Sequence, residues 1–127
     1  MKSLVLNTEP ESPYYPEVFF NAETGVCEIS GESYMEEAYK FYLPLINWIK
    51  EFIISEKKPL ELHVKLIYFN TSSSRLILDM LDILKKFRDE GNKVKVKWFF
   101  DSDDPDVKDE VEDFEIESGM DIELVEM

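Results

Sequence analysis

The sequence predicts an α/β domain built on a mixed β-sheet, and three stretches of the chain carry this prediction. Residues 61–66 alternate polar with apolar side chains before a continuously apolar end at 67–69, residues 76–87 repeat apolar side chains every three or four positions, and residues 94–100 alternate again. A strand, a helix and a strand within about forty residues form a βαβ crossover, which is parallel and right-handed. A β-hairpin expected over residues 17–30 adds antiparallel pairing.

The chain begins with a proline-rich stretch, residues 1–16, that suits neither a central strand nor a helix. We expect this stretch to lie extended along the edge of the domain. Short apolar runs at 17–20 and 26–30 follow, and the connection between them ends in Gly25. A short connection with a glycine is typical of a β-hairpin loop.

A helix is predicted next, beginning at about Tyr34. Ser33 and Glu36 have the spacing of a capping box, in which each side chain accepts a hydrogen bond from a backbone N–H at the helix start. Apolar residues then repeat at helical spacing as far as Phe52. Pro44 falls inside this pattern and predicts a kink or a division into two helices.

This predicted helix carries more aromatic side chains than one packing stripe needs. Part of its surface is therefore a candidate interaction face, and Tyr42 and Trp48 are the residues we assign to it. Burial in the core is the alternative for each of them, and it is the commoner position for any single aromatic residue.

The strand at 61–69 runs directly into residues 70–74, which we call the hydroxyl cluster: one Asn, one Thr and three Ser. Each of these residues can cap the helix that follows and ends before Gly91, yet a helix needs only one cap. A phosphoryl group added here meets the positive end of the helix dipole and free N–H donors. A plain helix cap is the alternative, and composition alone favours it.

Beyond the second strand of the crossover lies an acidic turn, residues 101–106. Its Asp spacing is similar to that of a calcium loop, but the central Gly and the terminal Glu are absent. We expect a solvated loop in which an Asp side chain caps a short helix over residues 107–114. Apolar residues at 122–127 are expected to form or flank a closing edge strand.

At 127 residues the chain has the length of one domain, so we expect residues 1–127 to fold as a unit. It carries 28 acidic and 14 basic residues, a formal net charge of −14. This charge repels phosphate backbones and anionic headgroups, so neither nucleic acid nor a membrane is an expected partner. The lone Cys27, the absence of a signal-peptide pattern and the absence of a long apolar run predict a cytoplasmic protein.

The residue types that most catalytic and metal sites need are scarce. His63 is the only histidine and Cys27 the only cysteine, so we expect no metal and no cofactor. We find no glycine-rich phosphate loop and no nucleophile elbow, and we expect that the protein is not an enzyme. The alternative is a small hydrolase or transferase with Ser72 or Ser73 as nucleophile and His63 as base.

Four motifs lie between Gly31 and the acidic residues that follow Phe100. They are Gly31-Glu32-Ser33 with Glu36, Phe41-Tyr42-Leu43-Pro44-Leu45 with Trp48, Tyr68-Phe69-Asn70-Thr71-Ser72-Ser73, and Trp98-Phe99-Phe100 before acidic residues. In these motifs the chain resembles the SiaC-like regulatory phosphoproteins, bacterial domains similar in fold to the STAS domains of anti-sigma-factor antagonists. The resemblance implies a single STAS-like domain whose helices pack mainly on one face of a mixed sheet.

In that family the threonine of the Asn-Thr-Ser-Ser motif is phosphorylated by a dedicated kinase and dephosphorylated by a PP2C-type phosphatase. The resemblance therefore assigns phosphorylation to Thr71. It places Asn70, Ser72 and Ser73 in the loop around Thr71, and Arg75, one turn into the helix, is a candidate neighbour of the phosphoryl group.

The unphosphorylated form in the best-known system of this family binds and activates a diguanylate cyclase. The function implied here is a phosphorylation-gated protein–protein interaction switch in cyclic-di-GMP signalling. The alternative is a constitutive binding or assembly module in which the hydroxyl cluster only caps a helix.

Overall fold

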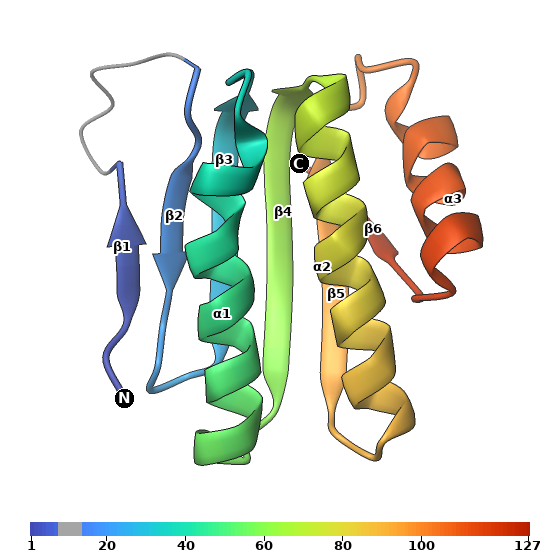
Figure 1. Cartoon of the computed structure of the whole chain (residues 1–127). Helices are drawn as coiled ribbons and strands as arrows, with labels where there is room; N and C mark the ends of the chain where they lie inside the picture. Colours follow the sequence, from blue (N-terminus) through green and yellow to red (C-terminus); the bar gives the residue numbers. More distant parts are fainter. Residues whose placement is uncertain (8–13) are drawn as a thin grey trace.

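The computed structural model describes residues 1–7 and 14–127, which form a six-stranded sheet and three helices (Figure 1). The strands are β1 (Leu4–Leu6), β2 (Glu17–Phe20), β3 (Val26–Ser33), β4 (Leu60–Phe69), β5 (Val94–Phe100) and β6 (Glu123–Glu126). The helices are α1 (Ala38–Glu56), α2 (Thr71–Asp89) and α3 (Val107–Ser118).

The sheet is mixed, as predicted. Its strand order is β1-β2-β3-β4-β5-β6, with antiparallel pairing from β1 to β3 and parallel pairing from β3 to β6. The β2–β3 hairpin, the β4-α2-β5 crossover and the closing edge strand β6 are confirmed. β1 lies at the opposite edge, in agreement with the edge position predicted for the N-terminal stretch. Residues 8–13 of that stretch lie outside the described residues.

Helices α1 and α2 lie side by side over one face of the sheet, and α3 lies beyond α2 near β6 (Figure 1). The core fills the space between the sheet and these helices, because alternate residues of β4 and the apolar stripes of α1 and α2 are buried there. α2 ends as predicted, with Glu90 as C-cap followed by Gly91 at φ +100°, a conformation that favours glycine.

The predicted interaction face on α1 is wrong for both of its assigned residues. The side chain of Tyr42 is fully buried and that of Trp48 is 7% exposed. The indole of Trp48 contacts the ring of Phe20 edge to face and stacks on that of Phe52, with ring centroids 5.3 and 5.2 Å apart. Both residues therefore belong to the core, where this aromatic packing contributes to stability.

The predicted start of α1 is also wrong. The helix begins at Ala38, and its N-cap residue, Glu37, makes no side-chain capping bond. Ser33, expected to be the first residue of a capping box, is instead the last residue of β3 and is fully buried. Nor does Pro44 divide the helix, which runs on through it. Pro44 lies on the exposed side, where water can bond the carbonyl group that lacks an N–H partner.

The acidic turn before α3 is closed by its own side chains. Carboxylate oxygens of Asp101 and Asp104 each accept a 3.0 Å hydrogen bond from the N–H two residues on. The N-cap of α3, Asp106, makes no side-chain capping bond, so the predicted Asp cap is wrong. Within residues 1–7 and 14–127, no three His, Cys, Asp or Glu side chains form a group suited to a metal ion. No helix in this part of the chain is long and apolar enough to span a membrane.

Candidate functional site

The hydroxyl cluster lies at the start of α2, where β4 ends. Asn70 is the N-cap of the helix, and its Oδ1 accepts a 2.8 Å hydrogen bond from the N–H of Ser73. Its Nδ2 donates to the carbonyl of Met35 at 2.9 Å, and its backbone N–H donates to the carbonyl of Ser33 at 3.0 Å. Asn70 thus fixes the first turn of α2 to the loop between β3 and α1.

A chain of buried hydroxyl groups reinforces this attachment. The hydroxyl of Ser73 donates to the backbone carbonyl of Ser33 at 3.1 Å, and the Oγ of Ser33 donates to the Oγ of Ser73 at 2.7 Å. The Oγ of Ser33 also lies 2.8 Å from the phenol oxygen of Tyr42, a hydrogen bond in which either hydroxyl can be the donor. Burial raises the pKa of the Tyr42 phenol to about 12, although the bond with Ser33 opposes the shift, so the phenol stays protonated.

The hydroxyl groups of the cluster therefore differ in availability. Ser73 is fully buried, and Ser72 donates from its Oγ to the carbonyl of Glu36 at 3.1 Å. Thr71 is exposed, and its hydroxyl has no hydrogen-bond partner among the described residues. The backbone N–H groups of Thr71 and Ser72 are likewise unpaired among the described residues. The cap residue, Asn70, accepts hydrogen bonds only from the N–H groups of Ser73 and Ser74.

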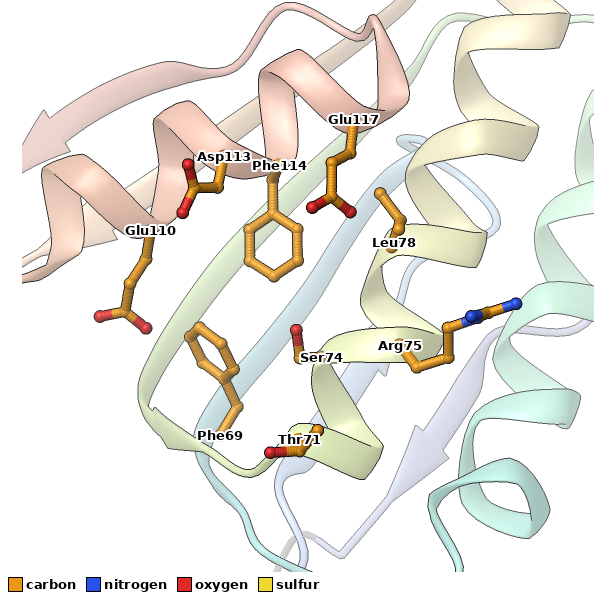
Figure 2. A pocket seen from close by; sticks show the side chains of 9 residues that line it. All are labelled: Phe69, Thr71, Ser74, Arg75, Leu78, Glu110, Asp113, Phe114 and Glu117. Atoms are coloured by element: carbon orange, nitrogen blue, oxygen red, sulfur yellow. The ribbon is translucent and has the colours of Figure 1, made fainter.

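Thr71 lies in a groove between α2 and α3, with a volume of about 450 Å³ (Figure 2). Apolar side chains of Phe69, Leu78 and Phe114 line part of the groove. Three carboxylates of α3 line the side that faces α2; they belong to Glu110, Asp113 and Glu117. Partial burial, followed by the nearby Asp104 and Asp106, raises the pKa of the Glu110 carboxyl above its ordinary value. The groove around Thr71 thus combines an apolar floor with an excess of negative charge.

Arg75 also lines this groove, but it is 77% exposed and its guanidinium points away from Thr71 (Figure 2). Its Nε lies 3.7 Å from a carboxylate oxygen of Asp79, one turn further along α2. In this conformation Arg75 does not contact the Thr71 hydroxyl, and a contact with a phosphoryl group requires a change of rotamer.

The groups needed for the nucleophilic alternative are not brought together. Ser73 is buried, and the ring Nε2 of His63 is bonded to Glu61 at 2.8 Å on the face of the sheet that α1 and α2 do not cover. Burial raises the pKa of the Cys27 thiol far above its ordinary value, which suppresses the reactive thiolate. Ser72 and Ser73 both donate to backbone carbonyls, and neither is bonded to His63.

Two parts of the site were not predicted from sequence. Ser33 and Tyr42 meet the hydroxyl cluster only because β3, α1 and α2 converge, and Ser33 lies 40 positions before Ser73. Glu110 and Phe114 reach the groove from α3. No local sequence pattern predicts contacts between residues so far apart. The surplus of hydroxyl residues did indicate the part of the chain where these residues converge.

Comparison with known proteins agrees with this architecture. The model of the SiaC family regulatory phosphoproteins matches residues 9–127. An uncharacterized protein of Pseudomonas aeruginosa strain UCBPP-PA14 is 30% identical over 105 residues, which cover 83% of each chain. The crystal structure of apo-SiaC from Pseudomonas aeruginosa is similar with a TM-score of 0.87 and 27% identity, over 98% of this chain and 99% of SiaC.

A second structure of SiaC is similar with a TM-score of 0.88 and 27% identity, over 98% of this chain and 99% of the SiaC chain. In it, SiaC from Pseudomonas aeruginosa is the activator in a complex with the diguanylate cyclase SiaD. The family match spans nearly the whole chain, and the fold of this chain is similar to that of SiaC over 98% of its length. The chain belongs to the SiaC family of regulatory phosphoproteins.

Proposed function

We propose that this protein is a phosphorylation-gated protein–protein interaction switch, without catalytic activity of its own, and that Thr71 accepts the phosphoryl group. The observation that carries the proposal is the availability of the Thr71 hydroxyl, which is exposed and unpaired among the described residues, while its neighbours Ser72 and Ser73 are hydrogen-bonded. A regulatory phosphoprotein needs such a residue, and the chain belongs to a family of them.

The start of α2 favours a phosphoryl group on Thr71, whereas the carboxylates of α3 on the other side of the groove oppose it. The unpaired N–H groups of Thr71 and Ser72 and the positive end of the helix dipole favour an anion. The carboxylates of Glu110, Asp113 and Glu117 line the same groove and repel it. An added charge of about −1.5 to −2 therefore stays directed toward solvent, where a docked partner would have to bury it.

The partner we propose is a diguanylate cyclase, which the unphosphorylated protein binds and activates. The complex of SiaC with SiaD supports this choice, because this chain shares the SiaC fold over nearly its whole length. A protein kinase and a PP2C-type phosphatase would set the fraction of Thr71 that carries phosphate.

The cyclase output is tested by adding the unphosphorylated protein to the purified diguanylate cyclase of the same organism and measuring the rate of cyclic-di-GMP formation. We expect the rate to rise with protein concentration and to saturate at least about fivefold above the basal rate, the lower end of typical coupling between sites. If the protein binds the cyclase to saturation but the rate is unchanged, the proposed binding stands and the proposed activation is wrong. An absence of binding would reject the cyclase as partner.

A constitutive binding or assembly module is the second candidate, because the Asn70 side chain does cap α2. In such a module Thr71 serves only the helix start, so Thr71→Ser has no effect and Thr71→Glu changes stability by about 1 kcal/mol without changing partner affinity. The partner affinity of Thr71→Glu therefore separates the switch from the module, and Thr71→Ser serves as the control.

A further inference from the structure

Three tyrosines form a continuous exposed surface beside the start of α2, and we call them the tyrosine row: Tyr14, Tyr34 and Tyr68. The ring centroids of Tyr14 and Tyr34 lie 5.8 Å apart, and those of Tyr34 and Tyr68 lie 5.3 Å apart. The three side chains are 52%, 48% and 48% exposed, and the adjacent Ile67 is 75% exposed. Aromatic rings held in contact with one another, yet half open to solvent, are typical of interface residues.

A β-bulge at the end of β4 creates part of this surface. The register of β3 with β4 shifts between Gly31 and Glu32, so that Gly31 pairs with Leu66 and Glu32 with Tyr68. Ile67 is the extra residue, and it interrupts the alternation that buries every second side chain of β4. Two consecutive apolar side chains are exposed as a result. Bulges that redirect side chains in this way are frequent next to functional sites.

The tyrosine row is tied directly to the loop that carries Thr71. Tyr34 lies between β3 and α1, and the next two residues, Met35 and Glu36, supply the carbonyl groups that bond Asn70 and Ser72. The backbone N–H of Tyr34 in turn donates to the carbonyl of Tyr14 at 2.8 Å. These hydrogen bonds therefore connect the tyrosine row to the start of α2, where Thr71 lies.

The charges around the tyrosine row are negative. Glu36 and Glu37 line a hollow of about 530 Å³ beside Tyr14 and Tyr34, and Glu32 pairs in register with Tyr68. The neighbouring Lys40 is already paired with Glu37, at 2.8 Å. Arginine complements such a surface, because its planar guanidinium stacks on aromatic rings and forms two parallel hydrogen bonds with a carboxylate. Aliphatic side chains complement the exposed ring faces and Ile67.

We propose that the tyrosine row is the docking surface for a segment of a partner protein that presents arginine and aliphatic side chains. This inference deepens the proposed function, since it names the chemistry of the segment that binds beside Thr71. The docked segment covers the row, and its arginines pair with Glu32, Glu36 and Glu37.

The direct test uses a fluorescein-labelled dodecapeptide of leucine and arginine, titrated with the full chain in a fluorescence anisotropy assay. The double variant Tyr34→Ser and Tyr68→Ser removes two rings of the row without changing the net charge. Tyr39→Ser is the control, because Tyr39 lies on α1 and is 60% exposed outside the row. Circular dichroism checks that each variant is folded.

We expect the double variant to raise the Kd of the peptide about tenfold, the loss typical of removing aromatic anchors, and Tyr39→Ser to leave it unchanged. A matched peptide with lysine in place of arginine should bind more weakly to the unaltered chain but be less sensitive to the double variant. Equal affinity of the arginine peptide for all three proteins would overturn the proposal, as would tighter binding of a leucine and glutamate peptide.

A second arm separates this inference from the proposed function. The same variants, unphosphorylated, are titrated with the diguanylate cyclase of the organism. If the unaltered chain binds the cyclase and the double variant binds it as tightly, the docking surface is wrong while the proposed partner stands. If the unaltered chain fails to bind the cyclase but the peptide depends on the row, the docking surface stands and the proposed partner is wrong.

Discussion

Thr71→Glu is expected to weaken binding of the proposed cyclase partner about a hundredfold or more while the chain stays folded. The substituted carboxylate lies in a groove that already contains Glu110, Asp113 and Glu117. A partner that covers this groove has to bury the new charge without a counter-ion, which typically costs several kcal/mol. The fold should persist, because Thr71 is exposed and the cap bonds of Asn70 do not involve its side chain.

Isothermal titration of the cyclase with each variant measures this effect. Thr71→Ser keeps a hydroxyl and Thr71→Val keeps the shape without charge, so both should retain affinity within about threefold. Because a carboxylate imitates a phosphoryl group poorly, the enzymatically phosphorylated protein is measured in the same series. Its loss of affinity should equal or exceed that of Thr71→Glu. Unchanged affinity of the fully phosphorylated protein would refute the proposal that phosphorylation controls binding.

Ser73→Ala is expected to lower the free energy of unfolding by about 2 kcal/mol. The hydroxyl of Ser73 is fully buried and takes part in two hydrogen bonds with Ser33, as donor to its carbonyl and as acceptor from its Oγ. Its removal leaves the buried hydroxyl of Ser33 without this acceptor, and an unpaired buried polar group costs more than the lost bond itself. Tyr42 still contacts Ser33, which limits the loss.

Ser74→Ala is the matched control, since it makes the same change at the next position of α2. Ser74 is partly exposed to the groove, and its side chain makes no hydrogen bond within the described residues. Chemical denaturation of both variants should show a loss of less than about 0.5 kcal/mol for Ser74→Ala. Equal losses in the two variants would mean that the buried hydroxyl chain does not stabilise the start of α2.

The parts of the fold that were predicted correctly are those that local periodicity determines. Alternation in β4 and β5 and the apolar repeat of α2 predict the parallel crossover, and the glycine-ended connection predicts the β2–β3 hairpin. The position of the hydroxyl cluster between a strand and a helix follows from the same patterns. Thr71 itself was assigned through the family motif, because hydroxyl residues in a row do not reveal which of them is exposed.

The parts that were predicted wrongly depend on contacts between distant residues. Ser33 has the local spacing of a capping box, but pairing with β4 extends β3 through it and its hydroxyl joins Ser73. The aromatic residues of α1 suggested an interaction face, yet Trp48 is covered by Phe20 from another element. The exposed aromatic surface lies instead at Tyr34 and Tyr68, where a bulge and a loop place it. No periodicity predicts that exposure.

The most direct test of the central claim, that Thr71 is a regulated phosphorylation site, is site-resolved mass spectrometry. The protein is isolated from its native host in several growth states, with phosphatases inhibited throughout. We expect a phosphoryl group on Thr71, distinguished from Ser72 and Ser73 by fragment ions, whose occupancy changes with growth state. Unmodified Thr71 in every state would show that it is not a regulated site and leave the hydroxyl cluster as a helix cap.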